Sequence, residues 1–259
     1  MLLLVGLGLE TKDLSVRALE EIKTAKLLFL EEYTSFLSKD YLRFIGKETR
    51  KTLDVVSRQD LEERVKEIVK KAKNAKIAIL VPGDPLIATT HSIILNEAEK
   101  QGIECLVLHS SSILSAAIGE SGLDAYKFGP VVTIPFWFAN YKPTSFLDVL
   151  EKNMKNNEHT LLLLDIDQKN KRPMKIEEAV EVLNKAESAR GSEGITDDLK
   201  VIVLADVGKK TQDIRYLKLG GLTKKIKEEL DGKVLSLIIP AQLSFAEKES
   251  LDRVSKNPV

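Results

Sequence analysis

The sequence contains few of the residues that build cross-links or metal sites. Its 259 residues include one cysteine, Cys105, and three scattered histidines, His91, His109 and His159. A single cysteine excludes a disulfide within the chain and any zinc site made of several cysteines, and it is typical of a reducing compartment. No histidine belongs to a His-x-x-x-His pair, so we predict no metal site. We expect His109 and His159, each beside a predicted strand, to be structural.

Net charge is also absent. Lys and Arg together number 39, and so do Asp and Glu. Proteins that bind nucleic acid as their main task usually carry a basic excess, because neutralising phosphates supplies most of the affinity. Aromatic residues make up only 5% of the chain, and those near Trp137 do not alternate with basic residues as a base-stacking surface requires. The composition therefore predicts no direct nucleic-acid partner.

No hydrophobic run is long enough to span a membrane. The apolar residues 1–9 lack a preceding basic segment and stop too soon for a span or a signal sequence. We expect this segment to be the first buried strand, and we predict a cytoplasmic protein with no membrane partner.

The most informative stretch is a buried strand followed by a stiff loop. Residues 77–81 are five consecutive apolar residues, which is typical of a strand covered on both faces. Pro82 and Pro85 then exclude a helix, and Gly83 between them permits unusual backbone angles. Ligands of open α/β sheets bind at the carboxyl ends of strands. An ordinary turn capped by Asp84 is the alternative, but so stiff a loop favours a preorganised ligand site.

Hydroxyl side chains precede two of the predicted helices. We expect Thr89 and Thr90 to cap the helix at 92–100. The serines at 110–112 would cap the helix at 113–119, or offer hydroxyls to a ligand lying across neighbouring strand ends.

Apolar runs and amphipathic stretches alternate along the chain in the order that predicts an α/β fold with a parallel sheet. The pattern of apolar runs and loops changes near residue 128, and this predicts two α/β lobes, residues 1–127 and 128–259. The expected strands are 2–5, 26–30, 53–56, 77–81, 105–109, 160–165, 200–205 and 234–239. The expected helices are 15–25, 60–73, 92–100, 113–119, 145–153, 176–190, 221–230 and 245–255.

Several catalytic motifs are missing or broken. Gly6-x-Gly8 follows the first strand as in a dinucleotide fold, but Thr11 stands where the third glycine is needed. The sequence contains neither a P-loop nor a Gly-x-Ser-x-Gly elbow. Asp165, at the end of a predicted strand, is an acid that either caps the loop or faces a ligand.

A set of motifs spread in order over most of the chain resembles a known family. They are Val5-Gly6-Leu7-Gly8-Leu9, Glu32-Tyr33-Thr34-Ser35, the loop from Pro82 to His91, Ser112-Ile113, Gly122-Leu123 with Tyr126-Lys127-Phe128-Gly129, Pro143-Thr144-Ser145, His159-Thr160-Leu161-Leu162 and Thr196-Asp197-Asp198. The chain is similar to the class III methyltransferases that include the tetrapyrrole methylases. The loop through His91 and the segment 126–129 point to the branch that acts in diphthamide synthesis.

The resemblance implies two α/β lobes that hold S-adenosylmethionine in a cleft between them, in a homodimer. It implies methylation of the amino group on a modified histidine of translation elongation factor 2. The implied cofactor contacts are Leu9, Asp84, Ile87, Ser112 and Ile113 in the first lobe and Leu164, Val207 and Leu235 in the second. Two positions depart from the family pattern: Asp206, where a basic residue is common, and Ala241, where glycine is common.

Methyl transfer to an amine is an in-line displacement, so the enzyme must chiefly align the reacting atoms in a partly dehydrated site. The leaving thioether needs no acid, and no general base is identified. Three other functions stay open: methylation of a tetrapyrrole or ribosomal RNA, a nicotinamide-dependent dehydrogenase, which the broken glycine pattern opposes, and a non-catalytic binding module.

Overall fold

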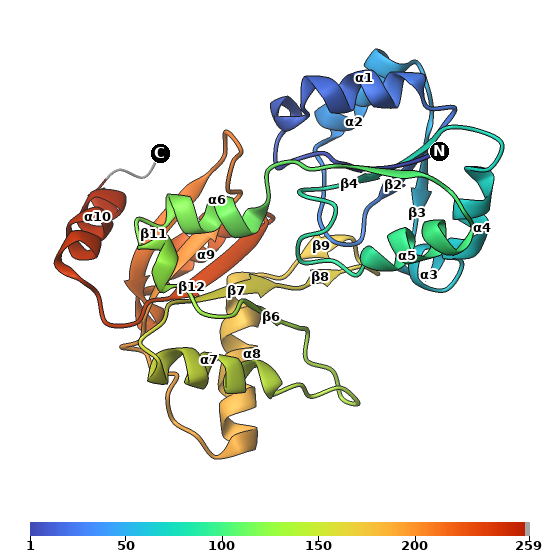
Figure 1. Ribbon diagram of the computed structural model, residues 1–259. Coiled ribbons are helices and arrows are strands. Elements are labelled where there is room, and N and C mark those ends of the chain that lie inside the picture. The colour runs from blue at the N-terminus through green and yellow to red at the C-terminus, as the bar shows by residue number, and fades with distance from the viewer. Residues whose placement is uncertain (257–259) are drawn as a thin grey trace. The chain divides into compact units, whose positions relative to one another are not determined.

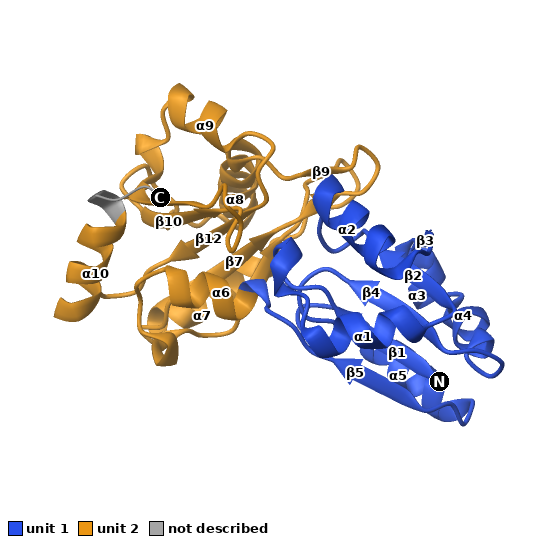
Figure 2. Cartoon of the chain, turned by 90° about the horizontal axis from the view of Figure 1, so that it is seen from above, with its two compact units in different colours: residues 1–113 blue, residues 114–259 orange. Residues whose placement is uncertain are grey.

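The computed structural model describes residues 1–256 and divides the chain into two compact units, with unit 1 comprising Met1–Ile113 and unit 2 starting at Leu114 (Figure 2). The expected boundary at residue 127 lies later in the chain. Residues 114–127 belong to unit 2 because the Asp124 N–H and the Lys127 ammonium bond to Glu247 there. The last three residues of the expected second lobe, 257–259, lie outside the described residues.

Unit 1 is built on a five-stranded parallel sheet in the order β3-β2-β4-β1-β5. The central strand β4 has no exposed side chain, as its unbroken apolar run predicts. All five strands expected in this unit are confirmed: β1 (Leu2–Gly6), β2 (Leu27–Glu31), β3 (Leu53–Val56), β4 (Ile77–Val81) and β5 (Cys105–Leu108).

Helices cover both faces of this sheet, so alternate strand residues face two separate apolar clusters (Figure 1). On one face lie α1 (Val16–Thr24) and α2 (Lys39–Thr49), and on the other lie α3 (Arg58–Glu62), α4 (Val65–Lys71) and α5 (Ser92–Lys100). The single helix expected over 60–73 is wrong. The Arg64 N–H bonds back to the Gln59 carbonyl, and this breaks the helix into two.

Unit 2 contains a mixed five-stranded sheet in the order β11-β10-β12-β7-β6. Only β6 and β7 are parallel. The strands are β6 (Val132–Ile134), β7 (Thr160–Leu164), β10 (Lys200–Ala205), β11 (Asp213–Lys218) and β12 (Leu235–Ile239), and a two-stranded ribbon joins β8 (Ile166–Asp167) to β9 (Arg172–Pro173). The expected α/β class is confirmed for this unit, although its sheet is not parallel throughout.

The helices of unit 2 are α6 (Ile113–Glu120), α7 (Ser145–Lys155), α8 (Ile176–Arg190), α9 (Lys224–Leu230) and α10 (Phe245–Lys256). α7, α8 and α9 pack on one face of the sheet around a single apolar cluster. Across residues 1–256 no helix combines the length and apolarity that a membrane span requires.

Candidate functional site

The loops that follow β1 and β4 touch each other directly at the carboxyl edge of the unit 1 sheet. The Gly8 N–H donates to the Gly83 carbonyl at 3.1 Å, and the Gly83 N–H donates to the Gly8 carbonyl at 2.9 Å. Because parallel strands end at one edge, this contact holds two loops together where an α/β sheet offers a ligand site.

Two glycines make this approach possible. A Cβ on Gly6 would lie 2.7 Å from the Gly83 carbonyl oxygen, and one on Gly8 would lie 2.3 Å from the Asp13 Cβ. Gly8 also has a φ of +73°, which favours glycine. Gly6 and Gly8 therefore permit the close packing of these loops.

Asp13 fastens the β1 loop to the loop after β5. Its carboxylate accepts from the Leu9 N–H at 2.9 Å and from the Ser111 hydroxyl at 2.8 Å. The Ser110 hydroxyl donates to the Asp13 carbonyl at 3.2 Å. These two serines thus bind the neighbouring loop. The sequence predicted either helix capping or ligand contact for them, and this role is neither.

Asp84 fastens the β4 loop to the same β5 loop. The side chain is 6% exposed, and its carboxylate accepts from the Leu86 N–H at 3.0 Å and from the Ser110 N–H at 3.2 Å. The His109 Nδ1 lies 2.8 Å from Oδ2, the same carboxylate oxygen that accepts from Ser110, and the His109 side chain is largely exposed. Asp84 thus shapes the loop, and through it three strand ends form one hydrogen-bonded assembly.

The five residues predicted to bind the cofactor in unit 1 all follow these strand ends. Leu9 and Ile113 are half-buried, Asp84 and Ser112 are buried, and Ile87 is 41% exposed. The structure brings them to a common edge of the sheet, and whether they contact a cofactor stays a prediction.

The three predicted residues of unit 2 gather at one end of its sheet. The Leu163–Ser236 register places Leu164 opposite Leu235, and Leu235 is also paired with Ala205. Val207 follows two residues after Ala205 and is buried. Three positions far apart in sequence therefore lie on, or just beyond the end of, adjoining strands.

The departure at Asp206 has a structural role beside Val207. Its φ is +49°, and its carboxylate accepts from Thr211 at 2.8 Å and pairs with Lys209 at 2.9 Å. Burial opposes ionisation of Asp206, but these donors outweigh it and lower the pKa. Asp206 therefore holds the turn that presents Val207.

Helix capping at α5 differs from the expectation. Thr89 accepts from the N–H of His91 at 3.3 Å, just before the helix. The Thr90 hydroxyl instead donates to Glu62 at 2.9 Å, so its predicted capping role is wrong.

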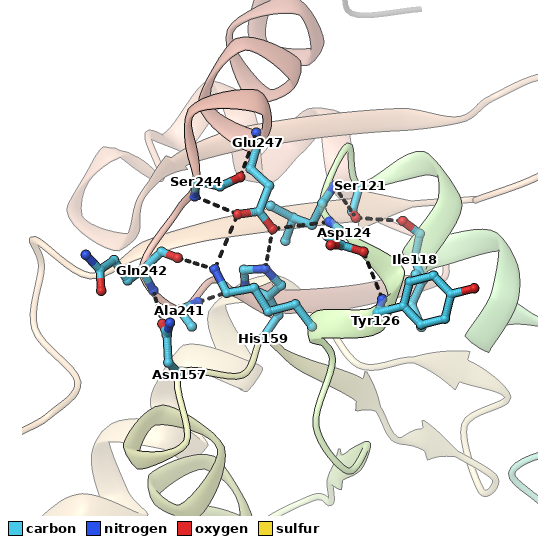
Figure 3. Close-up of polar contacts among 12 residues, drawn as sticks. Ile118, Ser121, Asp124, Tyr126, Asn157, His159, Ala241, Gln242, Ser244 and Glu247 are labelled. Carbon is cyan, nitrogen blue, oxygen red and sulfur yellow. Dashed lines mark hydrogen bonds and ion pairs between the residues drawn. The ribbon is translucent and has the colours of Figure 1, made fainter.

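A second polar cluster lies in unit 2 and centres on Glu247 of α10 (Figure 3). Its carboxylate lies 2.7 Å from the His159 Nε2 and accepts from the Ser244 N–H at 2.7 Å. The Ala241 N–H donates to the His159 Nδ1 at 2.9 Å, so the proton of the neutral ring resides on Nε2 and is donated to Glu247. Burial lowers the pKa of His159. His159 is structural, as expected.

Asp165 is used locally. Its carboxylate accepts from the N–H groups of Phe136 and Ile166, at 3.2 Å and 2.8 Å. The loop-capping reading is therefore the one that the contacts support. Among residues 1–256, no three His, Cys, Asp or Glu side chains lie together as the ligands of a metal ion would.

Comparisons with known proteins agree with this arrangement. Residues 1–223 match the family model described as Tetrapyrrole (Corrin/Porphyrin) Methylases. The chain is 36% identical to the diphthine synthase of Methanothermobacter thermautotrophicus, over 100% of this chain and 97% of that protein. It is 35% identical to the diphthine synthase of Methanocaldococcus jannaschii, over 99% of this chain and 100% of that protein. The crystal structure of a diphthine synthase superposes with a TM-score of 0.85 at 31% identity, covering 100% of this chain and 97% of that one.

Proposed function

Because the chain belongs to the tetrapyrrole methylase family, and within it to the diphthine synthases, we propose that it is an S-adenosylmethionine-dependent methyltransferase that methylates the amino group of the modified histidine of elongation factor 2. The observation that supports this most is the match over the full chain together with the three strand-end loops joined through Asp84 and Asp13.

The residues at the strand ends suit this cofactor. Segments 6–9, 82–90 and 109–113 contain no Lys or Arg, so they offer a pyrophosphate group none of the Lys or Arg side chains that commonly bind phosphates. They offer instead a buried carboxylate at Asp84 and apolar side chains at Leu9, Ile87 and Ile113. An adenosine bearing a positively charged sulfonium matches a site of this composition better than a dinucleotide does.

When bound, S-adenosylmethionine supplies an electrophilic methyl group on a sulfonium sulfur. The residues of unit 1 that would hold it are Leu9, Asp84, Ile87, Ser112 and Ile113, and the resemblance adds Leu164, Val207 and Leu235 of unit 2. Asp84 keeps the β4 loop in one conformation, and its charge offsets the positive charge of the ligand. The remaining task of the chain is to align the acceptor amine with the methyl group. The transfer needs no acid, because the leaving group is a neutral thioether.

Calorimetric titration with S-adenosylmethionine tests the role of Asp84. Asp84→Ala removes three hydrogen-bond acceptances and the charge, and we expect the affinity to fall at least about tenfold. Asp84→Asn keeps the size but not the charge, so an intermediate loss is expected. Asp40→Ala, an exposed carboxylate of the same unit, is the control and should bind as the unaltered chain does. Unchanged affinity in Asp84→Ala would contradict the assignment.

Elongation factor 2 is the proposed protein substrate. We expect labelled methyl transfer to the purified factor that carries the modified histidine, and none to the same factor before that modification. Transfer to a tetrapyrrole or to ribosomal RNA instead would place the chain elsewhere in the same family, and binding without transfer would make it a non-catalytic module.

The remaining parts of the proposal follow from the resemblance, which implies the dimer, and from the composition and motifs of the sequence, which predict the compartment and the other partners. The enzyme would act as a homodimer in the cytoplasm, where the elongation factor works, with no metal ion and with neither nucleic acid nor membrane as a direct partner. Sedimentation equilibrium tests the dimer, and a single species of monomer mass would contradict it.

A further inference from the structure

His91 lies within the motif that follows the Asp84 loop, yet none of the roles considered so far uses its side chain. The side chain is 1% exposed. A buried imidazole must have partners for both ring nitrogens, and both are present here. Nδ1 lies 3.0 Å from the Pro85 carbonyl oxygen, and Nε2 lies 3.0 Å from the Tyr33 hydroxyl oxygen.

These contacts fix the direction of each hydrogen bond. A carbonyl oxygen only accepts, so Nδ1 carries the proton and donates to Pro85. Burial lowers the pKa of His91, which favours the neutral ring. In that ring Nε2 is an acceptor, and the Tyr33 hydroxyl donates to it. The side chain therefore links the end of β2 to the loop after β4.

The β2 end of this link is itself held firmly. Glu31 is fully buried, and its carboxylate accepts from the N–H of Tyr33, and from the N–H of Thr34 at 2.7 Å. The Arg58 guanidinium lies 5.4 Å from the centre of the Tyr33 ring. Tyr33 is thus a fixed anchor toward which His91 is oriented.

The β4 end of the link is under strain. Ala88 has a φ of +56°, in the left-handed region that is unfavourable for a residue with a Cβ. Such a conformation persists only where the surroundings hold it. The Pro85 carbonyl, three residues before Ala88, accepts from His91 and also from the Thr89 hydroxyl at 3.2 Å. These two bonds close the loop around Ala88.

We propose that His91 is a positioning residue for methyl transfer: through Tyr33 and the Pro85 carbonyl it holds residues 84–88 in the conformation that binds the methyl donor. The inference rests on the proposed function, since it concerns the same loop. It assigns His91 no contact with the reacting atoms.

Three substitutions distinguish the contributions of the two hydrogen bonds that the His91 ring makes, one to Pro85 and one to Tyr33. His91→Leu removes both, and we expect the affinity for S-adenosylmethionine to fall about tenfold. His91→Asn keeps an N–H near the place of Nδ1, so the bond to Pro85 and most of the affinity should be retained. Tyr33→Phe removes only the hydroxyl and should have an intermediate effect. Thr49→Val is the control, because it removes a buried hydroxyl that bonds to Ile45 within α2, far along the chain from the loop.

A second readout does not depend on the cofactor. Backbone hydrogen exchange of residues 84–91, measured without ligand, should be faster in His91→Leu than in the unaltered chain, and close to normal in His91→Asn and Thr49→Val. Equal exchange and equal affinity in His91→Leu, or no rescue by Asn, would overturn the positioning role. A chain that shows the exchange pattern but binds no S-adenosylmethionine would instead contradict the proposed function.

Discussion

The acids that join loops in unit 1 are placed differently from the acids that fasten helices in unit 2. In unit 1, Asp84 and the partly buried Asp13 follow or adjoin the carboxyl ends of parallel strands, and they join one loop to another. In unit 2, Glu187 and Glu247 lie on helices, and they bond to the backbone of residues 194–195 and to His159. A parallel sheet brings all its strand ends to one edge, whereas a mixed sheet does not. Asp13 and Asp84 therefore join the strand-end loops of unit 1 where we propose that the methyl donor binds, whereas Glu187 and Glu247 secure the packing of unit 2.

The largest expected effect tests the loop packing of unit 1. Gly8→Ala would place a Cβ 2.3 Å from the Asp13 Cβ, so the β1 loop must move, and we expect the affinity for S-adenosylmethionine to fall about hundredfold. Gly102→Ala is the matched control: Gly102 has a similar φ of +66°, but its added Cβ would meet nothing within 4 Å. It should lose stability and keep its affinity. Calorimetry measures both affinities. Equal affinities in the two variants would show that the close packing at Gly8 does not matter for binding.

The next effect concerns the stability of unit 2. Glu247→Ala leaves the buried His159 Nε2 without its acceptor and removes one of two acceptors of the Lys127 ammonium, so we expect a loss of about 3 kcal/mol in the free energy of unfolding. Glu249→Ala, exposed on the same helix, should change it by less than about 0.5 kcal/mol. Urea denaturation measures both. A loss of similar size in the two variants would show that Glu247 is not the fastening residue.

Acid should weaken unit 2 through the same pair. Burial alone would raise the pKa of Glu247, but the N–H of Ser244 and the His159 ring outweigh it and lower the pKa to about 2. The unfolded chain, with an ordinary value of 4.5, then binds a proton before the folded chain does, so stability falls as the pH drops from about 4.5 toward 2. The lowered pKa of His159 adds a loss that begins below pH 6.5.

Denaturation midpoints measured across that pH range give the check. Glu247→Gln should flatten the part of the profile below pH 4.5, because the titrating group is gone. An unaltered profile in this variant would assign the acid sensitivity to other residues.

The smallest expected effect compares two arginines. Arg172 of unit 2 donates twice to Glu178, both at 2.7 Å, and its guanidinium lies 5.5 Å from the centre of the Phe136 ring. Arg172→Lys should cost about 1 kcal/mol of unfolding free energy, because lysine cannot make the paired bonds. Arg43→Lys changes an exposed pair of unit 1 and should cost less than about 0.5 kcal/mol. Thermal denaturation measures the loss of unfolding free energy in both variants. Equal losses would show that the paired bonds from Arg172 to Glu178 contribute nothing.

Local signals in the sequence were sufficient for much of the fold. The apolar run at 77–81 and the periodic stretch at 176–190 predict β4 and α8 with the bounds that the structure shows. α2 was not predicted, although Tyr41, Ile45 and Thr49 are buried at a spacing of four residues, because Gly46 and several charged residues interrupt the apolar pattern. β11 was missed as well, since its residues 213–218 mix charged and apolar side chains on an outer strand of the sheet.

The candidate site was only partly predictable for a different reason. Asp84 stands out because two prolines enclose it, and that signal is local. The serine partners of Asp13 are not local: the Ser111 hydroxyl that bonds to it is 98 residues away in sequence. Nothing in either segment alone indicates that contact, which arises only when β1 and β5 become neighbours in the sheet.

Chemical-shift mapping tests the central claim most directly. Amide spectra of the isotope-labelled chain would be recorded while S-adenosylmethionine is added, and the account predicts saturable shifts at Leu9, Asp84, Ile87, Ser112 and Ile113 in unit 1. Shifts at Leu164, Val207 and Leu235 would extend the site to unit 2. Saturable binding that leaves the amides of the β1, β4 and β5 loops unchanged, or no binding at all, would contradict the assignment of these strand ends as the place where the methyl donor is held.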